Sequence, residues 1–170
     1  MMNNRNEYSS VKVISDQLYL KCGYLLNNLI FQSEGLEYNA CSFSLNQRKV
    51  VYRTSKVTPT KIGQFVTIWK RNNSGITAPY SVDDDFDFMV ITSILHDKVG
   101  QFIFPKAILI AKQIVSTDNN IGKRGIRVYP PWYKVSSKQA VNTQAWQKKY
   151  FVELNTNDSV ELVRNIFETS

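Results

Sequence analysis

The residues best suited to chemistry form a cationic stretch over residues 50–71, V-V-Y-R-T-S-K-V-T-P-T-K-I-G-Q-F-V-T-I-W-K-R. Its cations are Arg53, Lys56, Lys61, Lys70 and Arg71. None of the fourteen Asp and Glu residues of the chain falls between Glu37 and Asp83. Charges of one sign repel when folding gathers them, so such a run is tolerated where an anion or the solvent screens it. The stretch therefore predicts a binding surface for phosphate-rich material.

A second group of cations lies in the glycine-containing turn and strand G-K-R-G-I-R. It adds Lys123, Arg124 and Arg127 to the predicted basic face. Lysine and arginine neutralise phosphates and release the counterions around them, so binding of nucleic acid here should weaken as salt rises. Two alternatives stay open: the cations form a solvated sheet face, or Arg53, Lys61 and Arg127 converge on a small phosphorylated ligand.

Aromatic residues accompany both groups of cations. Trp69, Tyr129 and Trp132 lie beside them in the sequence, and their rings could stack nucleobases. Aromatic residues of strands usually pack in the core, and for the two tryptophans we favour that interpretation.

Other polar residues exclude several classes of site. His96 is the only histidine, which excludes a multi-histidine metal site and disfavours a Ser-His-Asp triad. Cys22 and Cys41 have no C-x-x-C spacing for zinc and are too few for a disulfide framework. G-K-R-G has the spacing of neither a Walker loop nor G-x-G-x-x-G, so no nucleotide cofactor is indicated. The acids at residues 83–85 are interpreted as a solvated charge run that could balance the basic face.

Length and charge indicate one basic domain. A chain of 170 residues is long enough to bury a core without staples. The formal net charge of +7 favours a polyanionic partner, and nucleic acid is the partner we expect. No apolar run approaches the ~20 residues needed to span a bilayer, and the start of the chain lacks the apolar segment of a signal peptide. We therefore expect no membrane partner and a cytoplasmic location, where both cysteines would stay reduced.

The hydrophobic pattern predicts a mixed α/β (α+β) domain with a central mixed β-sheet flanked by helices. Apolar residues at steps of three and four from Val11 to Leu29 predict a first helix, capped by Ser9 or Ser10. The predicted strands cover residues 41–45, 49–56, 63–71, 88–95, 100–104 and 126–129. The first two form a hairpin, and 88–95 is a central strand because it is almost continuously apolar.

Further helices and a loop complete the prediction. The helices cover residues 106–114, 136–151 and 158–167. Ser136 or Ser137 can cap the second of these, and Asp158 with Glu161 has the spacing of a capping box for the third. Residues 72–80, N-N-S-G-I-T-A-P-Y, are rich in turn formers and predict a loop.

Several long phrases of the sequence, taken in order, resemble one bacterial family. They are E-Y-N-A, Y-R-T-S-K-V-T-P-T-K-I-G-Q-F-V-T-I-W-K-R, G-Q-F-I-F-P-K, G-K-R-G-I-R-V-Y-P-P-W and Q-A-W-Q-K-K-Y-F. Between Glu34 and Phe151 the chain is similar to the MepB family, and we expect a single MepB-like domain over residues 1–170. The resemblance implies a fold similar to the restriction-endonuclease-like nucleases, and with it a role with nucleic acid. Fold alone does not fix function.

That resemblance raises an alternative function, a Mg²⁺-dependent nuclease or phosphodiesterase. Such a centre holds the metal on two or three oxygen ligands beside a lysine, usually as an acid on one strand and D/E-x-K on the next. This sequence contains no D-x-K or E-x-K tripeptide. The nearest arrangement joins the metal ligands Glu37 and Asp87 with Gln101 and Lys106, or with Lys56 as the lysine. Gln101 in place of an acid removes one negative ligand, so binding without cleavage is the favoured function.

Overall fold

The fold is organised around one strand, β8 (Phe88–Leu95). The structure, a computed structural model, describes residues 11–170. In it β8 pairs in parallel with β3 (Arg48–Thr54) and antiparallel with β9 (Lys98–Pro105). Residues 88–93 are all buried, because alternate side chains of β8 enter two separate cores on the two faces of the sheet. The apolar pattern thus predicts this central strand correctly.

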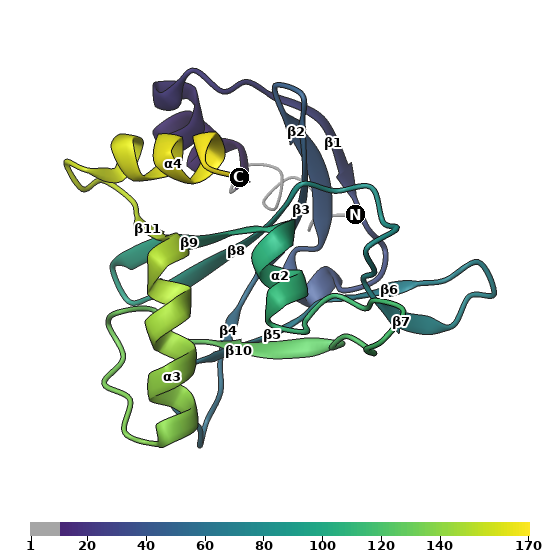
Figure 1. The fold of residues 1–170 in the computed structure, drawn as a ribbon. Helices are drawn as coiled ribbons and strands as arrows, with labels where there is room; N and C mark the ends of the chain where they lie inside the picture. The colour runs from purple at the N-terminus through teal and green to yellow at the C-terminus, as the bar shows by residue number, and fades with distance from the viewer. Residues whose placement is uncertain (1–10) are drawn as a thin grey trace.

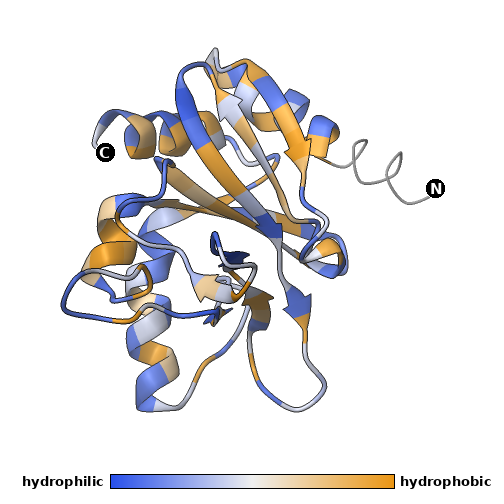
Figure 2. Cartoon of the chain, turned by 90° about the vertical axis from the view of Figure 1, so that its right-hand side faces the viewer, coloured by the Kyte–Doolittle hydropathy of each residue, from blue (hydrophilic) through white to orange (hydrophobic). Residues whose placement is uncertain are grey.

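Six strands form the central sheet, in the order β1-β2-β3-β8-β9-β11 (Figure 1). The strands not yet placed are β1 (Leu26–Phe31), β2 (Cys41–Leu45) and β11 (Phe151–Glu153). Every pair is antiparallel except β3 with β8, so the sheet is mixed. Apolar residues run along several of its strands (Figure 2). The predicted mixed α/β domain and the predicted β2–β3 hairpin are both confirmed.

Helices cover one face of the central sheet. The chain is helical over residues 11–22, as a turn of α-helix followed by a π-helical segment and a 3-10 turn, and it lies beside α4 (Ser159–Glu168) (Figure 1). Tyr19 and Phe167 meet edge to face here, with ring centroids 6.4 Å apart. Within residues 11–170, no helix combines the length and the apolar composition needed to cross a bilayer.

Two helices and a second sheet cover the other face. The helices are α2 (Lys106–Ala111) and α3 (Lys138–Gln147). The second sheet has the order β10-β5-β4 and is antiparallel, with strands β4 (Lys56–Val57), β5 (Gln64–Thr67) and β10 (Gly125–Val128). Val66 and Val128 of this sheet enter the same core as Leu109 of α2. These strands therefore form a second sheet, whereas the sequence predicted a single central sheet.

One predicted strand is divided between two sheets. Residues 63–71 form β5 and then β6 (Trp69–Arg71), which pairs with β7 (Thr77–Pro79) in a hairpin of its own. The chain bends at Ile68, whose side chain is buried and whose N–H donates to Arg124 O at 2.8 Å. The expectation that residues 72–80 form only a loop is wrong, because β7 lies within them.

The first predicted helix is too long. Gly23 has a φ of +86°, a left-handed conformation that ends the helical segment. Leu29, which the apolar spacing assigned to the helix, lies instead in β1, a strand that the sequence did not predict. The proposed caps, Ser9 and Ser10, fall outside the described residues.

Strand β1 forms one edge of the central sheet and is irregular. Its pairing with β2 shifts register between Asn27 and Ile30, and Asn28 between them has a φ of +55°. This irregularity breaks the alternation of apolar and polar residues that marks a strand in a sequence.

The last two predicted helices form, with one difference each. The side chain of Ser137 accepts a hydrogen bond from Ala140 N, as a helix cap should, but α3 ends at residue 147 and Phe151 belongs to β11. Helix α4 begins after Asp158 as expected. The side chain of Asp158 makes no capping hydrogen bond, so the predicted capping box with Glu161 is not formed.

A buried polar network crosses the core between β3, β8 and β9. The Tyr52 hydroxyl donates to Thr92 Oγ1 at 2.7 Å, and Gln101 Nε2 donates to the same oxygen at 3.0 Å. The Tyr19 hydroxyl donates to Gln101 Oε1. Burial raises the pKa of Tyr52 to about 12 and raises the pKa of Tyr19 well above its usual value. Both phenols therefore stay protonated further into alkali in the folded protein than in the unfolded chain.

We expect the free energy of unfolding to fall as the pH rises from 10 to about 12, the interval over which the fold retains the Tyr52 proton. An unfolded chain releases that proton near pH 10, so alkali favours unfolding by about 1.4 kcal/mol per pH unit for this residue. Below pH 10 the effect is absent. Urea denaturation across this range should give a shallower pH dependence for Tyr52→Phe than for the wild type, and equal slopes would contradict the assignment.

Candidate functional site

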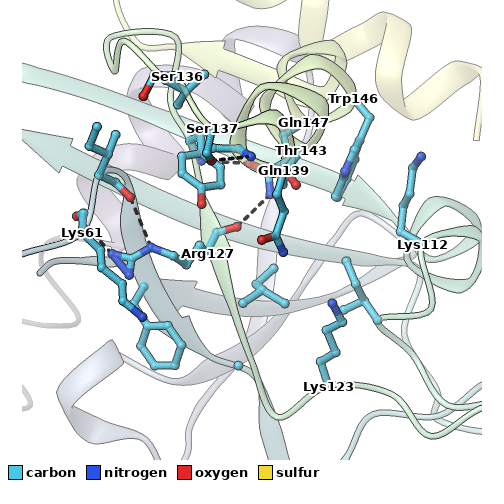
Figure 3. A pocket seen from close by; sticks show the side chains of 18 residues that line it. Lys61, Lys112, Lys123, Arg127, Ser136, Ser137, Gln139, Thr143, Trp146 and Gln147 are labelled. Atoms are coloured by element: carbon cyan, nitrogen blue, oxygen red, sulfur yellow. Dashed lines mark hydrogen bonds between the residues drawn. The ribbon is translucent and has the colours of Figure 1, made fainter.

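A groove lies between α3 and the second sheet (Figure 3). Its volume is about 740 Å³. Strands β5 and β10 contribute Phe65, Ile126 and Arg127, whereas α3 contributes a row of side chains from Gln139 to Gln147. Helix α3 and the second sheet both lie on this side of the molecule, and the groove is the space between them.

Four cations from four separate segments line the groove. They are Lys61 between β4 and β5, Lys112 after α2, Lys123 before β10, and Arg127 in β10. No Asp or Glu is among the lining residues. Throughout residues 11–170, no acid comes within ion-pair distance of any of the four. In Figure 3, Lys61 and Arg127 lie at one end of the groove, and Lys112 and Lys123 lie at the other.

Arg127 joins one end of the groove to the neighbouring loop. Its Nε donates to Ile62 O at 3.2 Å, and its Nη2 donates to Lys61 O at 3.2 Å and to the hydroxyl of Thr58. These bonds hold the loop that carries Lys61 against β10. The remaining nitrogen, Nη1, takes part in none of the three bonds, so Arg127 can both position Lys61 and offer a donor to a ligand.

A buried side-chain amide joins α3, which forms the wall of the groove, to β10, which forms its floor. Gln147 of α3, only 1% exposed, accepts from Tyr129 N at 2.8 Å through Oε1 and donates to Arg127 O at 3.0 Å through Nε2. Gln144 donates to Pro130 O and Tyr133 O at 3.1 and 2.9 Å. These bonds fix α3 to the strand and to the loop that follows it, so the groove is a built feature of the fold.

The N-terminal end of α3 and the two serines before it also face the groove. Ser136, Ser137 and Gln139 line it and are exposed. The N-terminus of a helix carries partial positive charge, because its first N–H groups have no partner within the helix. The helix terminus therefore adds to the positive potential that the four cations create.

Most of the other predicted cations are neutralised by acids. Lys56 pairs with Glu37 at 3.1 Å and Arg71 pairs with Glu34 at 2.9 Å. Ion pairs also join Lys70 to Asp84 and Lys49 to Asp85. The acids on either side of the acid-free span thus fold back onto it. Asp84 thus balances the basic stretch at Lys70, and Asp85 balances Lys49 just before it, as one interpretation of the acidic run expected.

Arg53 does not lie on a surface. It is 2% exposed, and its guanidinium donates to Tyr52 O at 2.7 Å, Gln32 Oε1 at 3.0 Å and Tyr80 OH at 3.2 Å. A weaker bond reaches Trp69 O at 3.5 Å. The prediction that Arg53 joins the phosphate-binding face is therefore wrong. Its side chain is buried in the core, where it hydrogen-bonds β3 to segments that are distant in the sequence.

The remaining predicted binding residues divide between the groove and its surroundings. Lys61, Lys123 and Arg127 are brought together in the groove. Arg124 donates to Thr77 O at 3.2 Å, beside the β6–β7 hairpin. The predicted meeting of Arg53, Lys61 and Arg127 is formed only by the last two.

Comparison with known proteins places the chain in a family. A family model described as MepB-like matches residues 32–153. The chain belongs to the MepB-like family. A crystal structure of MepB is similar to it at 36% sequence identity with a TM-score of 0.75, over 78% of this chain and 89% of that chain. Among curated proteins, no sequence matches the chain.

A second solved structure is more distant. The bacterial homing endonuclease I-Ssp6803I is 16% identical to this MepB-like chain, with a TM-score of 0.44 over 85% of this chain and 87% of that one. A likeness of that size carries no argument about what the MepB-like domain does. The expected similarity to restriction-endonuclease-like nucleases stays a prediction from the family.

The MepB-like domain does not bring the two predicted metal ligands together. Asp87 Oδ2 accepts from Lys49 N at 2.8 Å, at the beginning of β3. Glu37 pairs with Lys56, which follows the end of β3. The two carboxylates therefore lie at opposite ends of that strand, and neither can share a metal with the other.

The other two residues of the predicted centre are engaged elsewhere. Gln101 is fully buried within the tyrosine network of the core. Lys106 Nζ donates to Val82 O at 2.7 Å and to Asp84 O at 2.5 Å. In the part of the chain that the structure describes, no three His, Cys, Asp or Glu side chains are close enough to hold a metal ion. These residues do not fit a Mg²⁺ centre.

Sequence reasoning missed part of the groove. Lys112 and Trp146 are the main omissions, with Lys112 Nζ 5.6 Å from the centre of the Trp146 ring. Both lie in predicted helical segments, but nothing in the sequence showed which face of α3 would turn toward β10. Among the aromatic residues that were named, Tyr129 lines the groove, whereas Trp132 packs edge to face on Phe151 at 5.4 Å.

Replacing Arg53 should destabilise the domain more than replacing an exposed cation. We expect Arg53→Ala to lower the free energy of unfolding by roughly 3 kcal/mol, because it leaves buried acceptors without a donor. Lys56→Ala should cost less than about 1 kcal/mol, since its ion pair with Glu37 is exposed to solvent. Urea denaturation of both variants tests the difference, and an Arg53→Ala protein as stable as the wild type would contradict it.

Proposed function

We propose that the domain binds nucleic acid by its phosphates in the groove, without cleaving it. One observation carries the proposal: Lys61, Lys112, Lys123 and Arg127 line a single cavity that has no acid in its lining. Holding four cations together costs repulsion that no described acid relieves. A ligand with several negative charges relieves it, and a phosphodiester strand carries such charges at regular spacing.

The neutralised cations contribute less to this binding. Lys56, Lys70 and Arg71 each have a carboxylate partner that a phosphate would have to displace. Each of these pairs has no net charge at long range, so it adds little to the attraction for a polyanion. The groove, and not the whole basic stretch, is where we place the direct phosphate contacts.

The absence of cleavage is part of the proposal. A metal-dependent nuclease needs its acids and its lysine at one place. Here Asp87 holds the start of β3, Glu37 is paired at the other end, and Lys106 is bound to two backbone carbonyls. This arrangement supports binding over phosphodiester hydrolysis.

A small phosphorylated ligand is the second candidate. Lys61 and Arg127 are adjacent at one end of the groove, where a single phosphate could lie between them. The volume of the groove is also within the range of about 300–1,000 Å³ that is usual for small-molecule sites. We favour nucleic acid because the cations extend to both ends of the groove.

The cytoplasm is the compartment that we propose for this function. Cys22 and Cys41 are both buried, and buried thiols are typical of proteins kept under reducing conditions.

Reversing two groove charges should weaken binding strongly. We expect the double variant Lys61→Glu/Lys123→Glu to bind a labelled oligonucleotide at least tenfold more weakly than the wild type in fluorescence anisotropy. The plot of log K against log salt should also become shallower by roughly 1.5, since each lost phosphate contact removes about 0.7–0.9 from its slope.

The matched control is Lys21→Glu/Lys98→Glu. Both lysines are exposed and lie outside the groove, and the change in net charge is the same. This control should lose no more than about threefold in affinity, because only the long-range attraction changes. Equal losses in the two double variants would show that binding depends on net charge and not on the groove.

Binding should not require a divalent metal. We expect binding in EDTA to be at least as tight as in Mg²⁺ or Mn²⁺, because divalent cations compete for the phosphates, and we expect no cleavage of DNA or RNA in gel assays with either metal. Asp87→Ala should bind as the wild type does, because Asp87 lies at the start of β3 and does not line the groove. Metal-stimulated cleavage that disappears in Asp87→Ala would overturn the proposal in favour of the nuclease.

A further inference from the structure

The groove offers apolar surface as well as charge. Phe65 and Ile126 on its floor and Trp146 on its wall lie among the four cations. In a duplex the faces of the bases are stacked inside, so a protein meets mainly phosphates, sugars and base edges. A single strand presents phosphates and the faces of its bases together. We propose that the groove takes a single strand of nucleic acid, an inference that rests on the proposed function and narrows it.

The shape of the groove agrees with this narrower ligand. Protein elements that read the base edges of a duplex project into its major groove, which is about 12 Å wide. Here the cationic surface is recessed between α3 and β10, and Gln147 holds those two elements together from within. A recess has no projecting element for that readout, whereas an extended single strand can lie along it.

The charges are distributed as a strand would need them. Lys61 and Arg127 lie at one end of the groove, Lys112 and Lys123 lie at the other, and the side chain of Gln139 lies between the two ends (Figure 3). Different phosphates of one strand can contact the two cationic ends, which leaves the space between them for a base. A single phosphate would occupy only one end.

Trp146 provides a surface for that base. Its ring packs on Phe104, with centroids 5.2 Å apart, and Lys112 Nζ lies 5.6 Å from the ring centre. The residue is half-buried, and it lines the groove. Stacking of bases on aromatic rings tolerates any sequence, because every base has a π-face.

Polar groups along the same wall can contact base edges. The amide of Gln139 and the hydroxyls of Ser136 and Thr143 line the groove. Amides and hydroxyls both donate and accept, so they suit the Watson–Crick edges that an unpaired base exposes.

The first test compares one sequence in two forms. A mixed-sequence oligonucleotide of about twelve nucleotides, within the usual range of single-strand sites, is titrated with the wild type as a single strand and as its duplex, at the same salt. We expect the single strand to bind at least tenfold more tightly. Mononucleotides at the same phosphate concentration should not displace it.

The second test follows the fluorescence of Trp146. Binding of the single strand should quench the protein emission, and Trp146→Phe should lose most of that quenching while binding no more than about threefold more weakly, because a phenylalanine ring still stacks a base. Trp132→Phe is the matched control, because Trp132 packs on Phe151 and does not line the groove. It should keep both the quenching and the affinity. Phenylalanine keeps an aromatic ring on Phe104, so this variant is expected to fold.

The outcomes separate the two proposals. If neither the single strand nor the duplex binds, the proposed function itself fails. If the duplex binds as tightly as the single strand, or if quenching persists in Trp146→Phe, the single-strand inference is overturned while nucleic-acid binding stands. Displacement by mononucleotides would assign the groove to a small phosphorylated ligand and overturn the inference as well.

Discussion

The burial of β8 on both faces is the constraint from which the rest of the structure follows. A strand with two apolar faces needs a covering layer on each side, and this chain supplies two different layers. The N-terminal helical segment and α4 pack closely on one face. On the other face the chain places α2, α3 and a second sheet, and these leave a recess between them. The candidate site is therefore a consequence of how the second face is covered.

The recess is positive because charge is neutralised unevenly across the molecule. The acids at residues 34, 37, 84 and 85 lie close in space to the cations of β3, β4 and β6, and each forms an ion pair there. No acid of the described chain reaches the cations around β10. The fold thus gathers four cations without acid partners into a local positive field that the net charge of +7 alone does not reveal.

Local patterns predicted much of the fold, but not its layering. Apolar continuity identified β8, and turn residues with alternating apolar positions identified the β2–β3 hairpin. The division of residues 63–71 between two sheets depends on Ile68 turning into the core and bonding with a residue more than fifty positions away, so no local pattern records it. The irregular strand β1 was missed because its bulge breaks the alternation.

The same limit applies to the site. Lys61, Lys123 and Arg127 were identified as phosphate-binding candidates because cation clusters are visible in a sequence. Arg53 is an arginine like Arg127 and lies in the same cationic stretch as Lys61, yet its side chain is buried. Its burial depends on hydrogen bonds to Gln32 and Tyr80, which are distant in the sequence. Lys112 and Trp146 were missed for the converse reason, since they reach the groove from segments that share no pattern with it.

The bulge in β1 has a consequence for how molecules of this protein meet one another. An edge strand presents unpaired backbone groups to which a strand of another molecule can add, and this is a common route to aggregation. In β1 the shift of register at Asn28 interrupts that row of groups, even though Ile30 beside it is 62% exposed. Within residues 11–170 no strand pairs with the outer side of β1, and the irregular backbone protects this edge; replacing it with a regular strand would create an edge prone to self-association.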